Sequence, residues 1–265
     1  MRNSCIGSIV ALLVVPVIFS IGFAWPAQRS GAAKAKAAAP ADPHDLSGVW
    51  HQPMGRRDPT MSNERPPLTP WGQTKFDATK PGYGPRAIPP ALGNDPLGNC
   101  DPPGIPRLIF LEDFPNDVEI VQMPGRVMQF FERGHFWRDI WTDGRELPKD
   151  PEPRWLGYSV GKWDGDTFVV NSLGFDERSW LDRMGNVHSD EMRFQERYRR
   201  VNHDTLELSM TINDPKTYTK PWVSITKTLG LAPKPEGLDE IFCVPSEEQL
   251  FNRTIRDPAG GVIHK

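Results

Sequence analysis

Turn signals recur throughout residues 118–231, and they constrain the fold more than any other feature of the sequence. Asp164-Gly165 and Pro124-Gly125 each separate two short segments rich in β-branched and aromatic residues. Asp-Gly between two such segments is typical of a tight β-hairpin. The strands bounded by these and similar turns are predicted at 118–123, 126–132, 135–141, 158–163, 167–172, 191–201, 205–212 and 222–231.

Polar and apolar side chains alternate within these segments. The pattern is clearest in 205–212, where the apolar positions are Leu206, Leu208, Met210 and Ile212. Alternation of this kind predicts strands with one buried face. Consecutive hairpins with one apolar face form a meander, and a meander of this many strands closes into a barrel. The predicted fold is mainly all-β: one antiparallel meander closing into a β-barrel, with a long Pro-rich segment and a short C-terminal helix.

Two resemblances support this fold. Gly48-Val49-Trp50 on a first strand, followed by a meander and a helix, resembles the lipocalin arrangement, in which the Trp of the G-x-W motif closes one end of the barrel. Five further segments resemble a family of exported bacterial proteins, which implies export and a single domain but no particular activity. These segments are Leu68-Thr69-Pro70-Trp71-Gly72, Gly93-Asn94-Asp95-Pro96, Trp163-Asp164-Gly165-Asp166-Thr167, Val187-His188-Ser189-Asp190, and the run from Asp214-Pro215 to Pro221-Trp222.

The N-terminus has the layout of a secretory signal peptide. Arg2 precedes an apolar run over 6–24, and Gly22 and Ala24 occupy the positions read by a signal peptidase. We therefore expect a signal peptide at 1–24, a disordered tether at 25–43 and a single domain at 44–265. The protein would be periplasmic or secreted, with no stable membrane span after cleavage. The alternative is an uncleaved membrane anchor, because the run is long enough to span a bilayer.

Residues 53–106 are rich in Pro and Gly and poor in strand pattern. We expect them to wrap over the barrel or to form a lid; a loosely attached insertion is the alternative. Thr69 followed by Pro70 predicts a short helix from there to about Ala78. Ser246 to Gln249 reads as a capping box that opens the C-terminal helix.

Two cysteines, Cys100 and Cys243, lie within the predicted domain. An oxidising compartment favours a disulfide between them, which would join the Pro-rich segment to the C-terminal region. The alternative is two buried thiols.

Composition narrows the class of ligand. The chain has 31 basic and 34 acidic residues and a net charge of −3, without a basic stripe, so no nucleic acid partner is expected. No metal signature and no Gly-rich phosphate loop occurs in the sequence, so neither a metal nor a cofactor is predicted. Nine Trp residues can line a core or a pocket, and they favour a small apolar or aromatic molecule as partner.

Strand parity predicts a first cluster of polar residues. In 191–201, Glu196 and Arg200 share a face with Tyr198, and in 135–141 the same parity groups four residues: His135, Trp137, Asp139 and Trp141. If both aromatic faces point inward, these residues line one pocket. One alternative is a structural ion-pair network in which Arg200 neutralises Glu196 or Asp139. Another is that the faces are reversed and the aromatics form an outer patch.

The connection at 174–190 supplies the second cluster. It is dense in Asp, Trp and His, and loops at a barrel mouth often carry function. His188 with Asp190 or Asp176 could form a base and its orienting carboxylate. The alternatives are that His188 caps the next strand and that Asp176 is a turn residue.

Three functions are compatible with these residues. The first is an exported carrier whose pocket holds an apolar or aromatic molecule, bound by His135, Trp137, Asp139, Trp141, Tyr198 and Arg200. The second is a cofactor-free hydrolase, lyase or isomerase. In that hypothesis His188 is the base, Asp190 or Asp176 orients it, Glu196 is the acid, and Arg200 or His135 stabilises a developing anion. The third is an envelope protein whose Trp-rich face docks on a partner.

Overall fold

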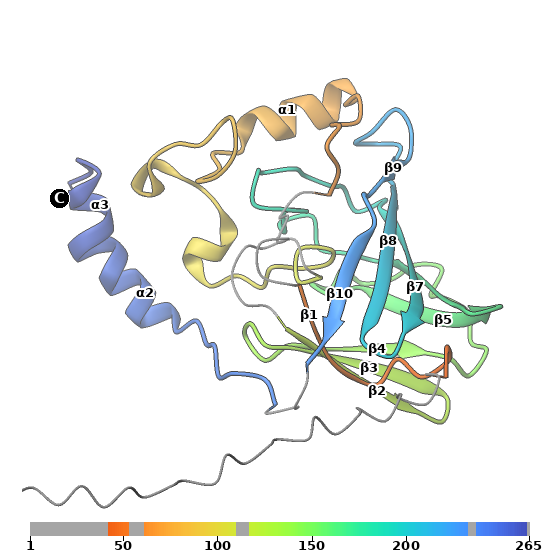
Figure 1. Ribbon diagram of the computed structural model, residues 1–265. Helices are drawn as coiled ribbons and strands as arrows, with labels where there is room; N and C mark the ends of the chain where they lie inside the picture. The colour runs from red at the N-terminus through yellow and green to blue at the C-terminus, as the bar shows by residue number, and fades with distance from the viewer. Residues whose placement is uncertain (1–41, 53–60, 110–116, 233–236, 264–265) are drawn as a thin grey trace, which may run out of the picture. The chain divides into compact units, whose positions relative to one another are not determined.

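The computed structural model describes residues 42–52, 61–109, 117–232 and 237–263, which belong to one compact unit spanning Ala38–Lys265. The predicted signal peptide, and the tether apart from residues 42 and 43, lie outside the described residues. The unit is built around a ten-stranded sheet that closes into a barrel (Figure 1). This closure confirms the predicted fold class and agrees coarsely with a lipocalin-like architecture.

The strands follow one another around the barrel in chain order. Their bounds are β1 Gly48–His51, β2 Val118–Met123, β3 Arg126–Phe131, β4 Trp137–Trp141, β5 Tyr158–Asp164, β6 Thr167–Leu173, β7 Arg193–Asn202, β8 Thr205–Asn213, β9 Trp222–Val223 and β10 Lys227–Leu231. Nine of them form the wall, because β10 pairs with both β1 and β8, and β9 extends the edge of β8.

One pair departs from the predicted antiparallel order. β4 and β5 are parallel and pair at two positions, Ile140 with Ser159 and Trp141 with Val160. The connection between them, residues 142–157, is long enough to return the chain to the same end of the barrel before β5 begins. The wall is therefore joined over a short length at this seam.

The segment predicted as one strand at 222–231 is instead split into β9 and β10. The hydroxyl of Ser224, in the break, accepts a hydrogen bond of 2.8 Å from the backbone N–H of Met210 on β8. A side-chain oxygen therefore occupies a place where a backbone carbonyl would continue the ladder. This break frees β10 to pair with β1 and close the barrel.

Trp50 on β1 is fully buried. Its indole N–H donates to the carbonyl of Leu46 at 2.8 Å, and the guanidinium of Arg200 lies 5.4 Å from its ring centre. Arg200 also donates to the carbonyls of Asp45 and His203, next to the turn between β7 and β8. Trp50 and Arg200 thus pack together at the end of the barrel that carries this turn.

The Pro-rich region and the residues directly after it contribute to the core of the barrel. Met61, Ile105, Leu108 and Ile109 are buried in the same cluster as the inward side chains of the strands. Helix α1, Pro70–Ala78, begins as predicted: the hydroxyl of Thr69 accepts from the N–H of Gly72 at 3.0 Å. Two 3₁₀ turns follow, η1 at Pro90–Leu92 and η2 at Pro96–Asn99.

The C-terminal segment consists of α2 Pro245–Phe251, the π-turn η3 Asn252–Arg256 and α3 Asp257–Ala259. The predicted capping box does not form, because the helix begins at Pro245 and its N-cap is Val244, without a side-chain cap. These helices lie beside η1 and η2 (Figure 1). Across the described part of the chain, no helix combines the length and hydropathy needed to span a membrane.

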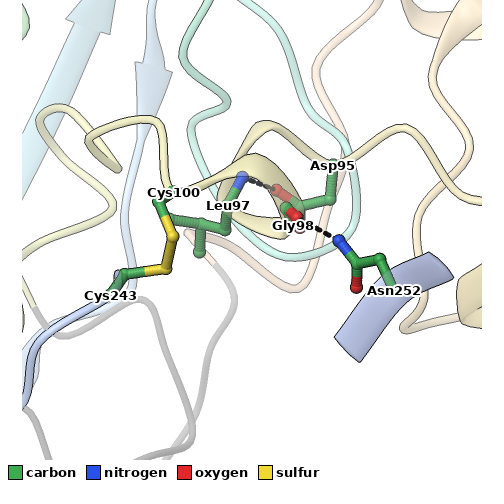
Figure 2. The surroundings of a disulfide bond; sticks show 6 residues. All are labelled: Asp95, Leu97, Gly98, Cys100, Cys243 and Asn252. Atoms are coloured by element: carbon green, nitrogen blue, oxygen red, sulfur yellow. Dashed lines mark hydrogen bonds between the residues drawn. A yellow bond between two sulfur atoms is a disulfide. The ribbon is translucent and has the colours of Figure 1, made fainter. Parts of the chain in front are cut away.

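Cys100 and Cys243 form a disulfide with their Cα atoms 5.5 Å apart, as predicted. Figure 2 shows it next to η2, where the Nδ2 of Asn252 donates to the carbonyl of Gly98 at 3.0 Å. The disulfide and this hydrogen bond attach the C-terminal segment to the Pro-rich region.

Candidate functional site

A polar network fills the middle of the barrel. Its members are Gln129 on β3, Arg138 on β4, Ser159 on β5, Ser172 on β6, and Glu196 and Tyr198 on β7, all of them buried. Arg138 donates to both carboxylate oxygens of Glu196, at 3.0 and 2.6 Å. Its other bonds reach the oxygens of Ser159, Gln129 and Ser172, so all five N–H groups of the guanidinium are used.

The Glu196 carboxylate is equally well satisfied, because the Tyr198 hydroxyl donates to it at 2.6 Å. Although burial lowers the pKa of Arg138, the charge and hydrogen bonds of Glu196 raise it further, so the net pKa lies above the usual value. Burial and the Glu196 charge hold the pKa of Tyr198 well above its usual value. Arg138 is therefore charged and the Tyr198 phenol is neutral at physiological pH.

The two strands of the predicted first cluster behave differently. On β7 the inward positions are Glu196, Tyr198 and Arg200, as predicted. On β4 the parity is wrong: Arg138 is buried, whereas Trp137 is 60% exposed. The reason is that Glu196 needs a cation inside the barrel, and Arg138 supplies it in place of the predicted Arg200.

His135 also lies outside the barrel, in the turn before β4. Its backbone has φ 51°, its ring stacks on Phe242 with centroids 4.4 Å apart, and its Nε2 lies 3.2 Å from the carbonyl of Asp239. The expected single pocket containing His135, Glu196 and Arg200 is therefore wrong.

His188 is buried in the loop before β7. Its Nδ1 lies 2.9 Å from the carbonyl oxygen of Ser189, and its Nε2 lies 2.9 Å from the hydroxyl of Ser179. A carbonyl oxygen only accepts, so Nδ1 carries the ring proton and Nε2 accepts from Ser179. Burial lowers the pKa of His188, which keeps the ring neutral.

The hydroxyl of Ser179 is covered by backbone. Gly104 has φ +74°, and a Cβ built there would lie 2.5 Å from the Ser179 oxygen. A residue with a side chain would therefore clash with this hydroxyl. Ser179 and His188 form a hydroxyl–imidazole pair, but both are 1% exposed.

The two carboxylates predicted to orient His188 have other partners. Asp190 accepts from the ammonium of Lys216 at 2.7 Å, and Asp176 forms a two-pronged ion pair with Arg178. These hydrogen bonds lower the pKa of both carboxyl groups. Neither carboxylate hydrogen-bonds the His188 ring, and the catalytic roles of all four residues stay predictions.

A large cleft lies on the outside of the barrel, where β4 meets β5. It has a volume of about 640 Å³. Trp137, Asp139 and Trp141 line it, so three of the predicted ligand-binding residues come together there on the face opposite to the one expected. Arg138 and Ser159 also reach it, which places the cleft against the outer side of the buried network.

The other wall of the cleft comes from residues 142–157 and the start of β5. Its main side chains are Trp155, Tyr158, Arg145 and Arg154. Sequence reasoning treated this segment as a connection between strands. The signal that could have identified it is the set of charged residues around its three prolines, flanked by Trp141, Trp155 and Tyr158.

Both ends of this loop are fixed. Arg145 stacks on Trp141, with its guanidinium carbon 3.6 Å from the ring centre, while it also bonds to Asp143. At the other end, the N–H of Arg154 donates to the carbonyl of Gly174 at 2.9 Å. Gly157 has φ +61°, and a Cβ there would lie 2.7 Å from the carbonyl oxygen of Leu173. Contacts at both ends of the loop therefore fix this wall of the cleft.

Within the residues that the structure describes, no three His, Cys, Asp or Glu side chains are grouped so as to hold a metal ion. Comparison of the chain with protein-family models, with curated proteins and with solved structures finds no match.

Proposed function

We propose that the protein is an exported small-molecule-binding barrel whose largely apolar or aromatic ligand occupies the outer cleft between β4 and residues 142–157. The cleft itself is the observation that carries the proposal. Its volume of about 640 Å³ falls within the range of ligand pockets. The interior of the barrel has less space for a ligand, because the network around Arg138 and Glu196 fills its middle.

The lining of the cleft matches an aromatic ligand. Trp137, Trp155 and Tyr158 present ring faces and edges suited to stacking. Trp137 is 60% exposed, and an indole left in water is a ready contact for an apolar partner. Arg154 lies over the Tyr158 ring at 4.4 Å and forms no ion pair among the described residues, so it is available to a polar group of the ligand.

Export is supported by the signal-peptide pattern at 1–24 and by the disulfide between Cys100 and Cys243. Disulfides persist in oxidising compartments such as the periplasm.

Binding is better supported than acid–base catalysis. An enzyme of that kind needs titratable groups that converge on an open pocket. Glu196 is saturated by Arg138 and Tyr198, and His188 is paired with Ser179 under Gly104. Asp139 and Glu146 do line the cleft, but Asp139 is paired with Arg126 at 3.2 Å, and the predicted base His188 does not line it.

The first test uses native mass spectrometry on the protein purified from the cell envelope, to detect a co-purified small molecule. The second uses 2-naphthoate as an aromatic probe and measures its binding by calorimetry. We expect Trp137→Ala and Trp155→Ala to weaken the binding of 2-naphthoate by about tenfold each, because each removes a stacking surface.

The matched control is Trp71→Ala. Trp71 lies on α1 between Lys75 and Lys216, away from the cleft. It should bind 2-naphthoate like the parent. If the parent and both cleft variants bind 2-naphthoate with equal affinity, the ligand site is not in this cleft.

A further inference from the structure

A second pocket lies between α1, residues 62–65 and the loop before β7. It has a volume of about 190 Å³ and is separate from the outer cleft. Two arginines, Arg65 and Arg86, line it together with Phe76. The polar side chains of Ser62, Asn63 and Asn186 complete its rim.

Arg86 is held rigidly at this pocket. Its Nη2 donates to the carbonyl of Thr79 and, at 3.2 Å, to the Thr79 hydroxyl. Its guanidinium carbon lies 3.8 Å from the centre of the Phe76 ring. One side of the guanidinium is thus fixed by hydrogen bonds, and one face is fixed by an aromatic ring.

The other terminal nitrogen of Arg86 has no partner. Nη1 is buried and makes no hydrogen bond among the described residues. A buried donor without an acceptor is costly, and the cost is greater when the donor carries charge. An acceptor bound in the pocket would remove that cost.

Arg65 adds a second positive charge to the same place. Its guanidinium carbon lies 4.6 Å from the centre of the Phe76 ring, and neither arginine forms an ion pair in the part of the chain that the structure describes. Burial lowers the pKa of Arg86, the charge of Asp77 raises it, and the charge of Arg65 lowers it by less. The nearest opposing charge is Asp77, which acts on Arg86 without contacting it and accepts a hydrogen bond from Gln73. Arg65 therefore repels Arg86, and within the described residues Asp77 opposes this repulsion without forming an ion pair with Arg86.

We propose that this pocket binds a small tetrahedral oxyanion, a phosphate group either free or carried by a phosphate monoester. Two guanidinium groups are the usual partners of phosphate oxygens, and the hydroxyl and amide groups of Ser62, Asn63 and Asn186 supply donors from other directions. Donors arranged on several sides suit an anion with four oxygens better than a planar carboxylate. An anion bound beside Arg65 and Arg86 would offset their repulsion, and a small turn of the Arg86 guanidinium would let it accept from Nη1.

The test is calorimetric titration of the full mature chain with inorganic phosphate, and in parallel with phenyl phosphate, sulfate, acetate and chloride at matched ionic strength. We expect phosphate and sulfate to bind and acetate and chloride not to bind. Binding of phenyl phosphate at least as tight as phosphate indicates a monoester as the natural ligand, whereas binding of phosphate alone indicates the free anion.

Arg86→Gln should weaken phosphate binding by about tenfold or more, because it removes a charge-assisted pair of donors. Arg65→Gln, at an exposed position, should weaken phosphate binding by a similar factor. If Arg86→Gln does not fold, Arg65→Gln alone tests whether phosphate binds at this pocket. The matched control is Arg178→Gln, which removes an exposed arginine paired with Asp176 elsewhere. Acetate binding as tightly as phosphate, no binding of phosphate, or unchanged phosphate binding in the arginine variants overturns the proposal.

Discussion

The guanidinium of Arg138 on β4 and the carboxylate of Glu196 on β7 face each other across the inside of the barrel, joined by hydrogen bonds of 3.0 and 2.6 Å. Both side chains are almost completely buried, at 2% and 0% exposure. Removing two charges from water is costly, and the cost is offset only where every donor and acceptor has a partner. Here Ser159, Ser172, Gln129 and Tyr198 supply the remaining partners.

This pair should be strongly coupled. Arg138→Met alone is expected to destabilise the protein by about 3–5 kcal/mol, because it leaves the Glu196 charge buried without a partner. Glu196→Leu should cost a similar amount, and the double variant should recover much of the loss. The measurement is urea unfolding followed by circular dichroism.

The exposed pair Arg199–Glu207 on the adjoining strands β7 and β8 serves as the control. Arg199→Gln should change the free energy of unfolding by about 1 kcal/mol or less, as surface ion pairs do. If the double variant of the buried pair loses as much free energy of unfolding as the two single variants together, the two side chains are energetically independent.

The strand order could be predicted from the sequence because turn chemistry and alternation are local. Asp164-Gly165 joins β5 and β6, and the alternation of 205–212 reappears as buried and half-buried positions on β8. The seam between β4 and β5 could not be predicted this way, because its parallel pairing depends on where residues 142–157 bring the chain back.

The candidate site could be predicted in part. Glu196 and Tyr198 were placed on the correct face by parity alone. The face of β4 cannot be predicted in the same way. Its two Trp side chains suggest that their face is buried, but Arg138 on the other face is buried because it pairs with Glu196, 58 residues further along the chain. The local pattern of hydrophobic residues gives no information on this long-range pair. It therefore predicts that the three cleft residues Trp137, Asp139 and Trp141 lie inside the barrel.

Trp50 should be among the most important side chains for stability. It is fully buried, donates to Leu46, and lies under Arg200. Trp50→Ala is expected to cost about 3–5 kcal/mol, as large core truncations do. Thermal and urea unfolding measure the effect. Trp137→Ala, at a 60% exposed position, is the matched comparison and should cost less than about 1 kcal/mol; equal losses for the two variants would contradict the burial of Trp50.

The disulfide should act mainly on the C-terminal segment. Cys100→Ser with Cys243→Ser removes a covalent attachment between regions 143 residues apart, leaving the bond from Asn252 to Gly98 among the remaining contacts. We expect faster amide exchange in α2 and little change in the hairpin of β7 and β8, because local stability follows local contacts. Hydrogen exchange with mass spectrometry reads both regions in one experiment. Faster exchange of the β7–β8 hairpin to the same extent would mean instead that the disulfide holds the barrel.

His188 should make stability depend on pH in a defined window. Burial lowers its pKa in the folded protein, whereas the unfolded chain has a histidine pKa of about 6.5. Between these two values the unfolded state binds the proton and the folded state does not, so the free energy of unfolding decreases as the pH falls below about 6.5. One such group contributes a slope of at most about 1.4 kcal/mol per pH unit. His188→Gln should lower stability at neutral pH by disturbing the bonds to Ser179 and Ser189, yet it should flatten the slope below about pH 6.5. His203→Gln, at an exposed position, is the control for replacing a histidine by glutamine. Urea unfolding at several pH values measures all three proteins, and parallel curves for the parent and His188→Gln would show that the buried ring is not the group that titrates.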